Sequence, residues 1–260
     1  MKPIAGPITA PTAAPITVPT AAPVAVPATA PVAVVFDLFG VIACAQSPAG
    51  QADILAAAGV PASGAEQFWR AYWDCRPPYD RGRLSGPDYW GSVADAVGAA
   101  FTPARIAELI AADCGSWRAV DPRMLDLLDV LARRGLTLGL LSNIPPELAD
   151  EFLRRHAWLD RFAVLGFSCR IGLVKPEPAA FDWCIRALGV EPGSLLFVDD
   201  REENVRAARA RGMQGHLFTD AATFTQSIAS WLRPDTAPPV GDHSSRYRIG
   251  THSSTWSRRR

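Results

Sequence analysis

Residues 34–42 read Val-Val-Phe-Asp-Leu-Phe-Gly-Val-Ile, a short apolar run that stops at a carboxylate and continues into a glycine turn. An apolar run of this length beside a turn signal predicts a buried β-strand that delivers Asp37 to the carboxyl end of a sheet. In open α/β sheets, ligands bind outside that end. Asp37 is therefore a candidate site residue, although an isolated strand-end aspartate is more commonly a turn cap.

Strands and helices alternate along residues 119–232. Apolar strand patterns at 136–141, 164–167, 195–198 and near 216–218 are separated by helical patterns. This alternation predicts a doubly wound, Rossmann-like α/β core with a parallel sheet and right-handed crossovers. Because parallel strands bring their carboxyl ends to one edge, the polar residues that follow these strands are expected to lie near Asp37.

Residues 47–118, between the first strand and the rest of the core, have a helical pattern and hold most of the tryptophans and tyrosines of the chain. They predict a helical cap with an aromatic core. Pro77 and Pro78 interrupt the pattern shortly before Gly82. We therefore expect residues 79–81 to form a loop of the cap, within an α/β core that comprises residues 34–46 and 119–232.

The two ends of the chain differ from the core in composition. In residues 1–33 a proline recurs every four residues, which predicts polyproline II or disorder rather than helix or sheet. Residues 233–260 carry six arginines against two aspartates, which is typical of a solvated, disordered basic tail. Since the net charge of the whole chain is zero, the part between the ends is acidic, and nucleic acid is not an expected partner.

The cysteine pattern and the hydropathy indicate in which compartment the protein is located. The five cysteines include no Cys-x-x-Cys pair, so neither a zinc site nor a disulfide framework is predicted. No apolar run is long enough to span a membrane. We therefore expect a cytoplasmic protein without a membrane partner, and the sequence does not indicate an oligomeric state.

The other candidate residues each have a structural and a chemical interpretation. The Ser142 hydroxyl and the Asn143 N–H could hold a phosphate oxygen, or Ser142 could cap the helix that Pro145 opens. Lys175 is the only lysine besides Lys2 among 24 arginines, which indicates a need for a compact ammonium group unless the skewed composition left it there by chance.

Asp199 and Asp200 follow the strand pattern at 195–198. They could stabilise a helix N-terminus through the helix dipole. Alternatively they could bind Mg²⁺, which prefers carboxylate and carbonyl oxygens.

The order of these segments resembles the haloacid dehalogenase (HAD) superfamily. Asp37 before a glycine turn, Ser142 at a strand end, Gly-x-x-Lys-Pro-Glu-Pro at 172–178 and Val-Asp-Asp-x-x-x-Asn at 198–204 look like its four motifs. The resemblance covers about residues 34–220. It is closest to the branch that contains the phosphatase domain of soluble epoxide hydrolases and small bacterial sugar-phosphate phosphatases.

The resemblance implies a Mg²⁺-dependent phosphatase of a small phosphorylated metabolite. Asp37 would be the nucleophile that forms an aspartyl-phosphate, and Lys175 would hold the phosphoryl group together with Ser142 and Asn143. The implied Mg²⁺ ligands are Asp37, Asp200 and the Phe39 carbonyl, with support from Asp199 and Asn204. The helical cap would close over the site and select the substrate.

Phe39 departs from the family pattern. Phosphatases of this superfamily usually read Asp-x-Asp, and their second Asp protonates the leaving oxygen and later activates water. Phenylalanine can do neither, and the loss of a general acid–base typically costs about 10²–10⁴ in rate. Asp80, Asp199 and Glu202 are the candidates to replace it.

Two alternatives remain open. A metal-independent 2-haloacid dehalogenase would normally have an aromatic residue at the Phe39 position, whereas a non-catalytic phosphate-binding or interaction protein would have lost turnover through Phe39. The crowding of Asp37, Asp199 and Asp200 around Lys175 favours the phosphatase, because a divalent cation would balance their charge. Arg81 in the expected cap loop either binds a second anionic or hydroxylated part of the substrate or is solvated.

Overall fold

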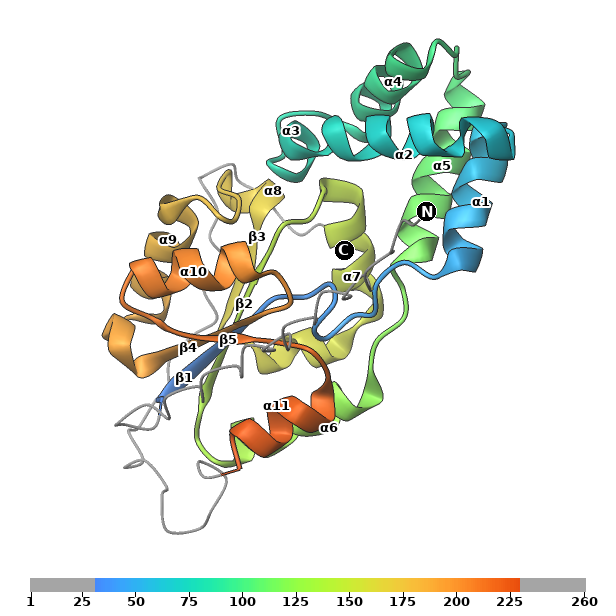
Figure 1. Cartoon of the computed structure of the whole chain (residues 1–260). Coiled ribbons are helices and arrows are strands. Elements are labelled where there is room, and N and C mark those ends of the chain that lie inside the picture. The colour runs from blue at the N-terminus through green and yellow to red at the C-terminus, as the bar shows by residue number, and fades with distance from the viewer. Residues whose placement is uncertain (1–30, 230–260) are drawn as a thin grey trace, which may run out of the picture.

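The computed structural model describes residues 31–229, so residues 1–30 of the segment predicted to be disordered and the predicted tail 233–260 lie outside this range (Figure 1). The bound of residue 33 for the disordered segment was wrong, because Ala33 already belongs to the first strand. A five-stranded parallel sheet with the order β3-β2-β1-β4-β5 forms the core. Its strands are β1 (Ala33–Phe36), β2 (Thr137–Ser142), β3 (Val164–Phe167), β4 (Leu195–Asp199) and β5 (Gln214–Leu217). The predicted α/β fold with a doubly wound parallel sheet is confirmed.

Helices cover both faces of the sheet. One face packs against α6 (Pro122–Arg133), α7 (Pro146–Arg155) and α11 (Ala221–Ser227), and the other against α9 (Pro178–Leu188) and α10 (Glu202–Ala210). In β1, Val34 and Phe36 belong to the first layer and Val35 to the second. Burial on both faces explains why this strand is a continuous apolar run rather than an alternating one.

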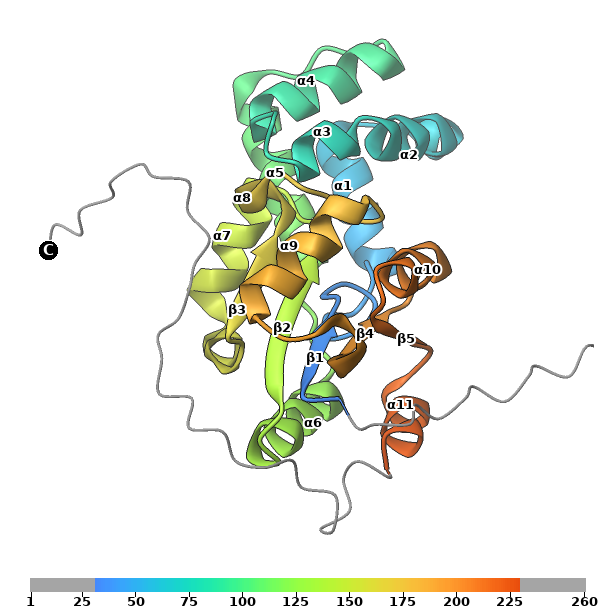
Figure 2. The same cartoon turned by 90° about the vertical axis from the view of Figure 1, so that its left-hand side faces the viewer.

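Five helices are inserted between β1 and the core helix α6. They are α1 (Pro48–Ala58), α2 (Ala65–Asp74), α3 (Arg76–Asp80), α4 (Gly86–Val97) and α5 (Pro103–Ser116). They share an apolar core that includes Phe68, Tyr72 and Trp90. Figures 1 and 2 show them standing at the end of the sheet to which the strands point. Hereafter this helical insert is called the cap. The short helix α8 (Ser168–Ile171) and the 3₁₀ segments Ala62–Gly64, Ala157–Arg161 and Pro192–Ser194 complete the described elements.

The prediction of a loop at residues 79–81 was wrong. Pro77 and Pro78 lie in the first turn of α3, where a backbone N–H has no partner within the helix and proline is tolerated. Tyr79 and Asp80 are therefore helical, and Tyr79 is buried. Only Arg81 lies outside the helix, as its C-cap.

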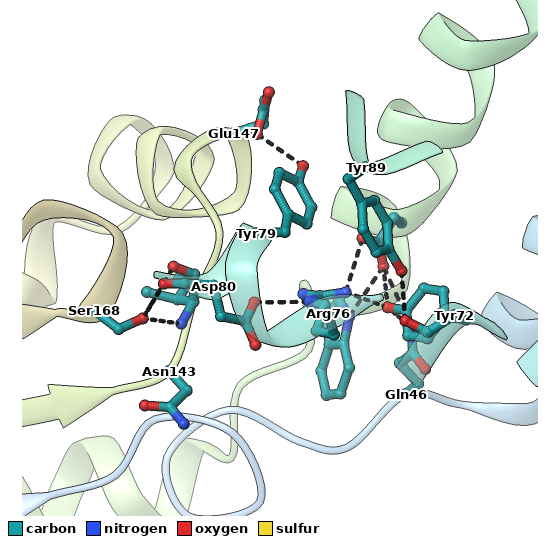
Figure 3. A network of polar contacts seen from close by, with 12 residues as sticks. Gln46, Tyr72, Arg76, Tyr79, Asp80, Tyr89, Asn143, Glu147 and Ser168 are labelled. Atoms are coloured by element: carbon teal, nitrogen blue, oxygen red, sulfur yellow. Dashed lines mark hydrogen bonds and ion pairs between the residues drawn. The ribbon is translucent and has the colours of Figure 1, made fainter. Parts of the chain in front are cut away.

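Hydrogen bonds of helix α3 connect the cap to the core (Figure 3). The Tyr79 hydroxyl donates to a Glu147 carboxylate oxygen at 2.7 Å, and the Ser168 hydroxyl donates to the Asp80 carbonyl at 2.5 Å. Gly82 follows with φ +74°, and a side chain there would collide with the Cys169 carbonyl oxygen. These contacts hold one turn of cap helix over the strand ends. Among the described residues, no helix has the length and apolarity needed to cross a membrane.

Candidate active site

The sheet brings Asp37 and Asp199 side by side. Strand order reverses about β1, which lies between β2 and β4, and ligands of doubly wound sheets bind at such a reversal. Phe36 is in register with Val198 of β4, and the Asp37 N–H donates to the Val198 carbonyl at 2.8 Å. Asp37 and Asp199, which follow this pair, therefore lie side by side at the carboxyl ends of neighbouring strands.

Lys175 bridges these two carboxylates. Its Nζ lies 2.8 Å from Asp37 Oδ1 and 2.6 Å from Asp199 Oδ2, and the ammonium group is buried. The Asn143 side chain positions the lysine, because its Nδ2 donates to the Lys175 carbonyl at 2.8 Å and its Oδ1 accepts from the Lys175 N–H at 2.9 Å. The rare lysine thus sits where a compact cation is required.

Negative charge exceeds positive charge around Asp37. Burial raises the pKa of Asp37 against the attraction of Lys175, and the neighbouring Asp199 raises it further. Burial opposes the charge of Lys175 too, but the two carboxylates outweigh it and raise the Lys175 pKa, so the amine stays protonated. Burial and Asp199 also raise the pKa of Asp200. One ammonium group cannot balance three carboxylates.

The residues present fit a magnesium ion. Carboxylate oxygens of Asp37, Asp199 and Asp200 all lie within 4.8 Å of one another. Asp199 already accepts hydrogen bonds from Lys175, the Asn204 side chain and the Arg201 N–H. Asp37 and Asp200 are thus the carboxylates that remain for a metal, and such oxygen donors suit Mg²⁺.

The turn after β1 is shaped around Asp200. Gly40 has φ +82°, and a Cβ there would collide with the Asp200 carboxylate. Only glycine therefore lets Asp200 approach the turn. Within residues 31–229, the backbone hydrogen bonds of this turn include those accepted by the Leu38 carbonyl, and none is accepted by the Phe39 carbonyl. The Phe39 carbonyl oxygen is therefore available as a third Mg²⁺ ligand beside Asp37 and Asp200.

Ser142 ends β2 with a buried hydroxyl. Its Oγ has no hydrogen-bond partner among the described residues, and an unpaired buried hydroxyl costs free energy. The alternative expectation that Ser142 caps the following helix was wrong, because Pro145 is the N-cap of α7 and no side chain caps it. The hydroxyl can thus donate to an oxygen atom of a ligand, but Ser142 is not among the residues that line the cavity between the core and the cap.

A cavity of about 680 Å³ opens between the core and the cap. On the core side Asp37, Phe39, Asn143, Lys175, Asp200 and Asn204 line it, and on the cap side Trp73, Arg76, Asp80 and Trp117 do so. The Phe39 ring packs against Trp117, with the ring centroids 4.8 Å apart. The residue that replaces the family's second aspartate is thus part of an aromatic wall.

The structure does not bring Arg81 into the cavity lining. Its guanidinium pairs with Glu177, and it donates to the Gly172 carbonyl at 3.3 Å. Of the three acids expected to replace the missing second aspartate, Asp80 lines the cavity. Asp199 is fully buried, and Glu202 does not line the cavity.

Arg76 is the cap cation that faces the cavity, and sequence reasoning missed it. Its Nε lies 2.7 Å from Asp80 Oδ1, and its Nη1 lies 2.6 Å from the Tyr72 hydroxyl (Figure 3). The same Nη1 lies 3.3 Å from Asp113 Oδ2. One signal was available. Asp113 follows the buried Leu109 by one helical turn of α5, and a carboxylate on an apolar face requires a partner.

Comparisons with known proteins agree with this geometry. A family model described as haloacid dehalogenase-like hydrolase matches residues 31–212. Phosphatase MT3486 of Mycobacterium tuberculosis is 30% identical over 187 residues, which cover 71% of this chain and 85% of that protein. Sesquiterpene phosphatase astK of Aspergillus oryzae is 28% identical over 143 residues, which cover 55% of this chain and 71% of that protein.

A HAD family enzyme of Bacteroides thetaiotaomicron shares the fold. Its crystal structure superposes with a TM-score of 0.64 at 18% identity, and the match covers 76% of this chain and 98% of that one. The same enzyme has also been crystallised as a magnesium complex.

Proposed function

Because this chain belongs to the haloacid dehalogenase-like hydrolases, we propose that it is a Mg²⁺-dependent phosphatase that forms an aspartyl-phosphate on Asp37. One observation carries the proposal: one carboxylate oxygen each of Asp37, Asp199 and Asp200 lie within 4.8 Å of one another, and the Lys175 ammonium group pairs with only the first two residues. The phosphatase names of relatives and the magnesium complex of the Bacteroides enzyme support it. Small phosphorylated molecules are the proposed substrates, and a cytoplasmic location stays a prediction.

In the proposed reaction an Asp37 oxygen attacks phosphorus, and the bond from phosphorus to the leaving oxygen breaks. Water then attacks phosphorus, the bond to Asp37 breaks, and inorganic phosphate leaves. Lys175 and the hydroxyl of Ser142 hold phosphoryl oxygens, together with the backbone N–H of Asn143. Mg²⁺ held by Asp37, Asp200 and the Phe39 carbonyl would supply the positive charge that the site lacks.

The dehalogenase alternative explains less of the site. A metal-free dehalogenase could use Asp200 as a base toward water, but it would have to hold Asp37, Asp199 and Asp200 together beside Lys175 without a divalent cation. A non-catalytic phosphate-binding protein would not need a carboxylate where the phosphoryl group binds, because the two negative charges repel each other.

The metal requirement tests the proposal. Asp200→Asn should raise the Mg²⁺ concentration for half-maximal activity at least about tenfold, as loss of a metal partner commonly does. Thermal unfolding without metal should change little, because the Asp200 side chain is exposed to solvent. Calorimetric titration with Mg²⁺ measures the affinity, and Glu202→Gln in the first turn of α10 is the control outside the cavity. Full activity in the presence of a chelator, together with turnover of 2-haloacids, would favour the dehalogenase.

Phe39 should make the rate depend steeply on the leaving group. Without an acid at this position, an alkyl alcohol departs as a poorly stabilised alkoxide, whereas aryl and acyl groups leave as weaker bases. The expected result is a steep decline of kcat/KM as leaving-group pKa rises, which Phe39→Asp flattens and Phe39→Leu does not. Rates on a series of aryl and alkyl phosphates measure the slope.

Asp80 is the expected replacement acid that lines the cavity, and burial raises its pKa despite the neighbouring Arg76. A shallow slope that becomes steep in Asp80→Asn would therefore show that Asp80 donates the proton. That result would refute the expectation of an unassisted leaving group.

A further inference from the structure

Three aromatic rings form a continuous wall from the cavity entrance to the nucleophile. Trp73 on α2 is 49% exposed, its ring centroid lies 6.4 Å from that of Trp117, and Trp117 packs against Phe39. Phe39 is two residues from Asp37. Pro77, Pro176 and other apolar residues extend the same lining. Ligand cavities of this size are commonly apolar with a few polar groups that fix orientation.

The cations of the cavity lining are already paired. Arg76 faces Asp80 and Asp113, and Lys175 faces Asp37 and Asp199. The third cation in the lining is Arg201, whose Nη2 lies 2.5 Å from a carboxylate oxygen of Glu203. Within residues 31–229, a second anionic group on the substrate would therefore meet Asp80 on the cap side, and Arg201 could receive it only by leaving its exposed ion pair with Glu203.

We propose that the cavity selects phosphate monoesters whose leaving group is uncharged and apolar, bound against Phe39, Trp73 and Trp117. The inference rests on the proposed phosphatase function and specifies its substrate class. An apolar group would cover the exposed Trp73 indole and displace water from the wall, which is favourable in proportion to the apolar area buried. A leaving group with a carboxylate or a second phosphate would instead lose its hydration, and it would gain a counter-charge only by breaking an ion pair that already exists in the lining.

Matched substrates test the selectivity. Para-ethylphenyl phosphate and para-carboxymethylphenyl phosphate have similar size and similar leaving-group acidity but differ by one negative charge. We expect kcat/KM to be higher for the ethyl compound by at least about tenfold, because like charges brought together cost several kcal/mol. Equal rates on the pair, or a preference for the charged compound, would overturn the inference while leaving the phosphatase function intact.

Phosphonates separate binding from turnover. Benzylphosphonate and para-carboxybenzylphosphonate cannot be hydrolysed, and calorimetry in the presence of Mg²⁺ measures their affinities. Preferred binding of benzylphosphonate would support the inference even if no phosphate ester were hydrolysed, in which case only the proposed function would fail. If neither phosphonate binds and neither ester is hydrolysed, both proposals are wrong.

Trp73 offers a variant that should remain folded, because its side chain is half exposed. Trp73→Ala should lower kcat/KM for naphthyl phosphate about tenfold, mainly through KM, as the loss of an aromatic contact would. Acetyl phosphate, which is too small to span the wall, should be affected much less. Trp69→Ala, one turn earlier on α2 and outside the cavity lining, should leave both substrates unchanged. Equal losses on the large and the small substrate would contradict a role of the wall in selectivity.

Discussion

Asp37→Asn should abolish phosphate release from every ester, with a loss of at least roughly 10⁴-fold, while the protein stays folded. An amide cannot form the aspartyl-phosphate, and no other described carboxylate occupies the same place at the end of β1. Stability should not fall, because burial disfavours the charge of Asp37 and Lys175 keeps its ion pair with Asp199. Steady-state kinetics and thermal unfolding measure the two outcomes.

Benzylphosphonate binding is the control for this variant. If Asp37→Asn still binds the phosphonate but does not turn over esters, the loss is chemical rather than structural. Activity within about tenfold of the unchanged protein, a difference of only about 1.4 kcal/mol in the barrier, would show that water attacks phosphorus directly.

Arg76→Ala should produce the largest loss of stability. The guanidinium of Arg76 is buried between Asp80 and Asp113, and its removal leaves the buried Asp113 carboxylate and the mostly buried Asp80 carboxylate without a counter-charge. Breaking a buried ion pair by removing one partner typically costs about 3–5 kcal/mol. Urea unfolding measures the change, and a midpoint unaltered from the unchanged protein would contradict the role given to this network.

Arg70→Ala is the matched control on the neighbouring helix α2. Arg70 pairs with Glu66 one turn away, and both side chains are mostly exposed. Exposed pairs of this kind contribute about 0.2–1 kcal/mol. The contrast between the two arginines isolates the effect of burial, since each variant removes one guanidinium from the cap.

The sheet and the nucleophile could be predicted because their signals are local. The strand at 164–167 was located to the residue, and β2 and β4 each ended within one residue of the expected position. Each of these strands is buried and bounded by turn residues, so the pattern alone identifies it. Because parallel strands share one edge, the convergence of Asp37, Ser142 and Asp199 followed from topology.

The cap could not be predicted to the same depth because its contacts are long-range. The Pro77-Pro78 pair indicated a break, but the chain uses both prolines inside the first turn of α3. The Arg76 network joins α3 to Asp113 on α5, and no spacing rule pairs residues so far apart. Arg81 was expected either to contact the substrate or to be solvated, whereas Glu177 engages it outside the cavity lining.

Chemical trapping of Asp37 during turnover tests the central claim most directly. The protein is mixed with Mg²⁺ and an aryl phosphate, quenched rapidly, and reduced with borohydride, which converts an acyl phosphate on Asp37 to homoserine. We expect mass spectrometry to find homoserine at position 37, dependent on substrate and Mg²⁺ and absent from Asp37→Asn. Undiminished phosphate release with Asp37 unmodified at every quench time would contradict the aspartyl-phosphate mechanism. Incorporation of ¹⁸O from labelled water into the Asp37 carboxylate during turnover of a 2-haloacid would also contradict it.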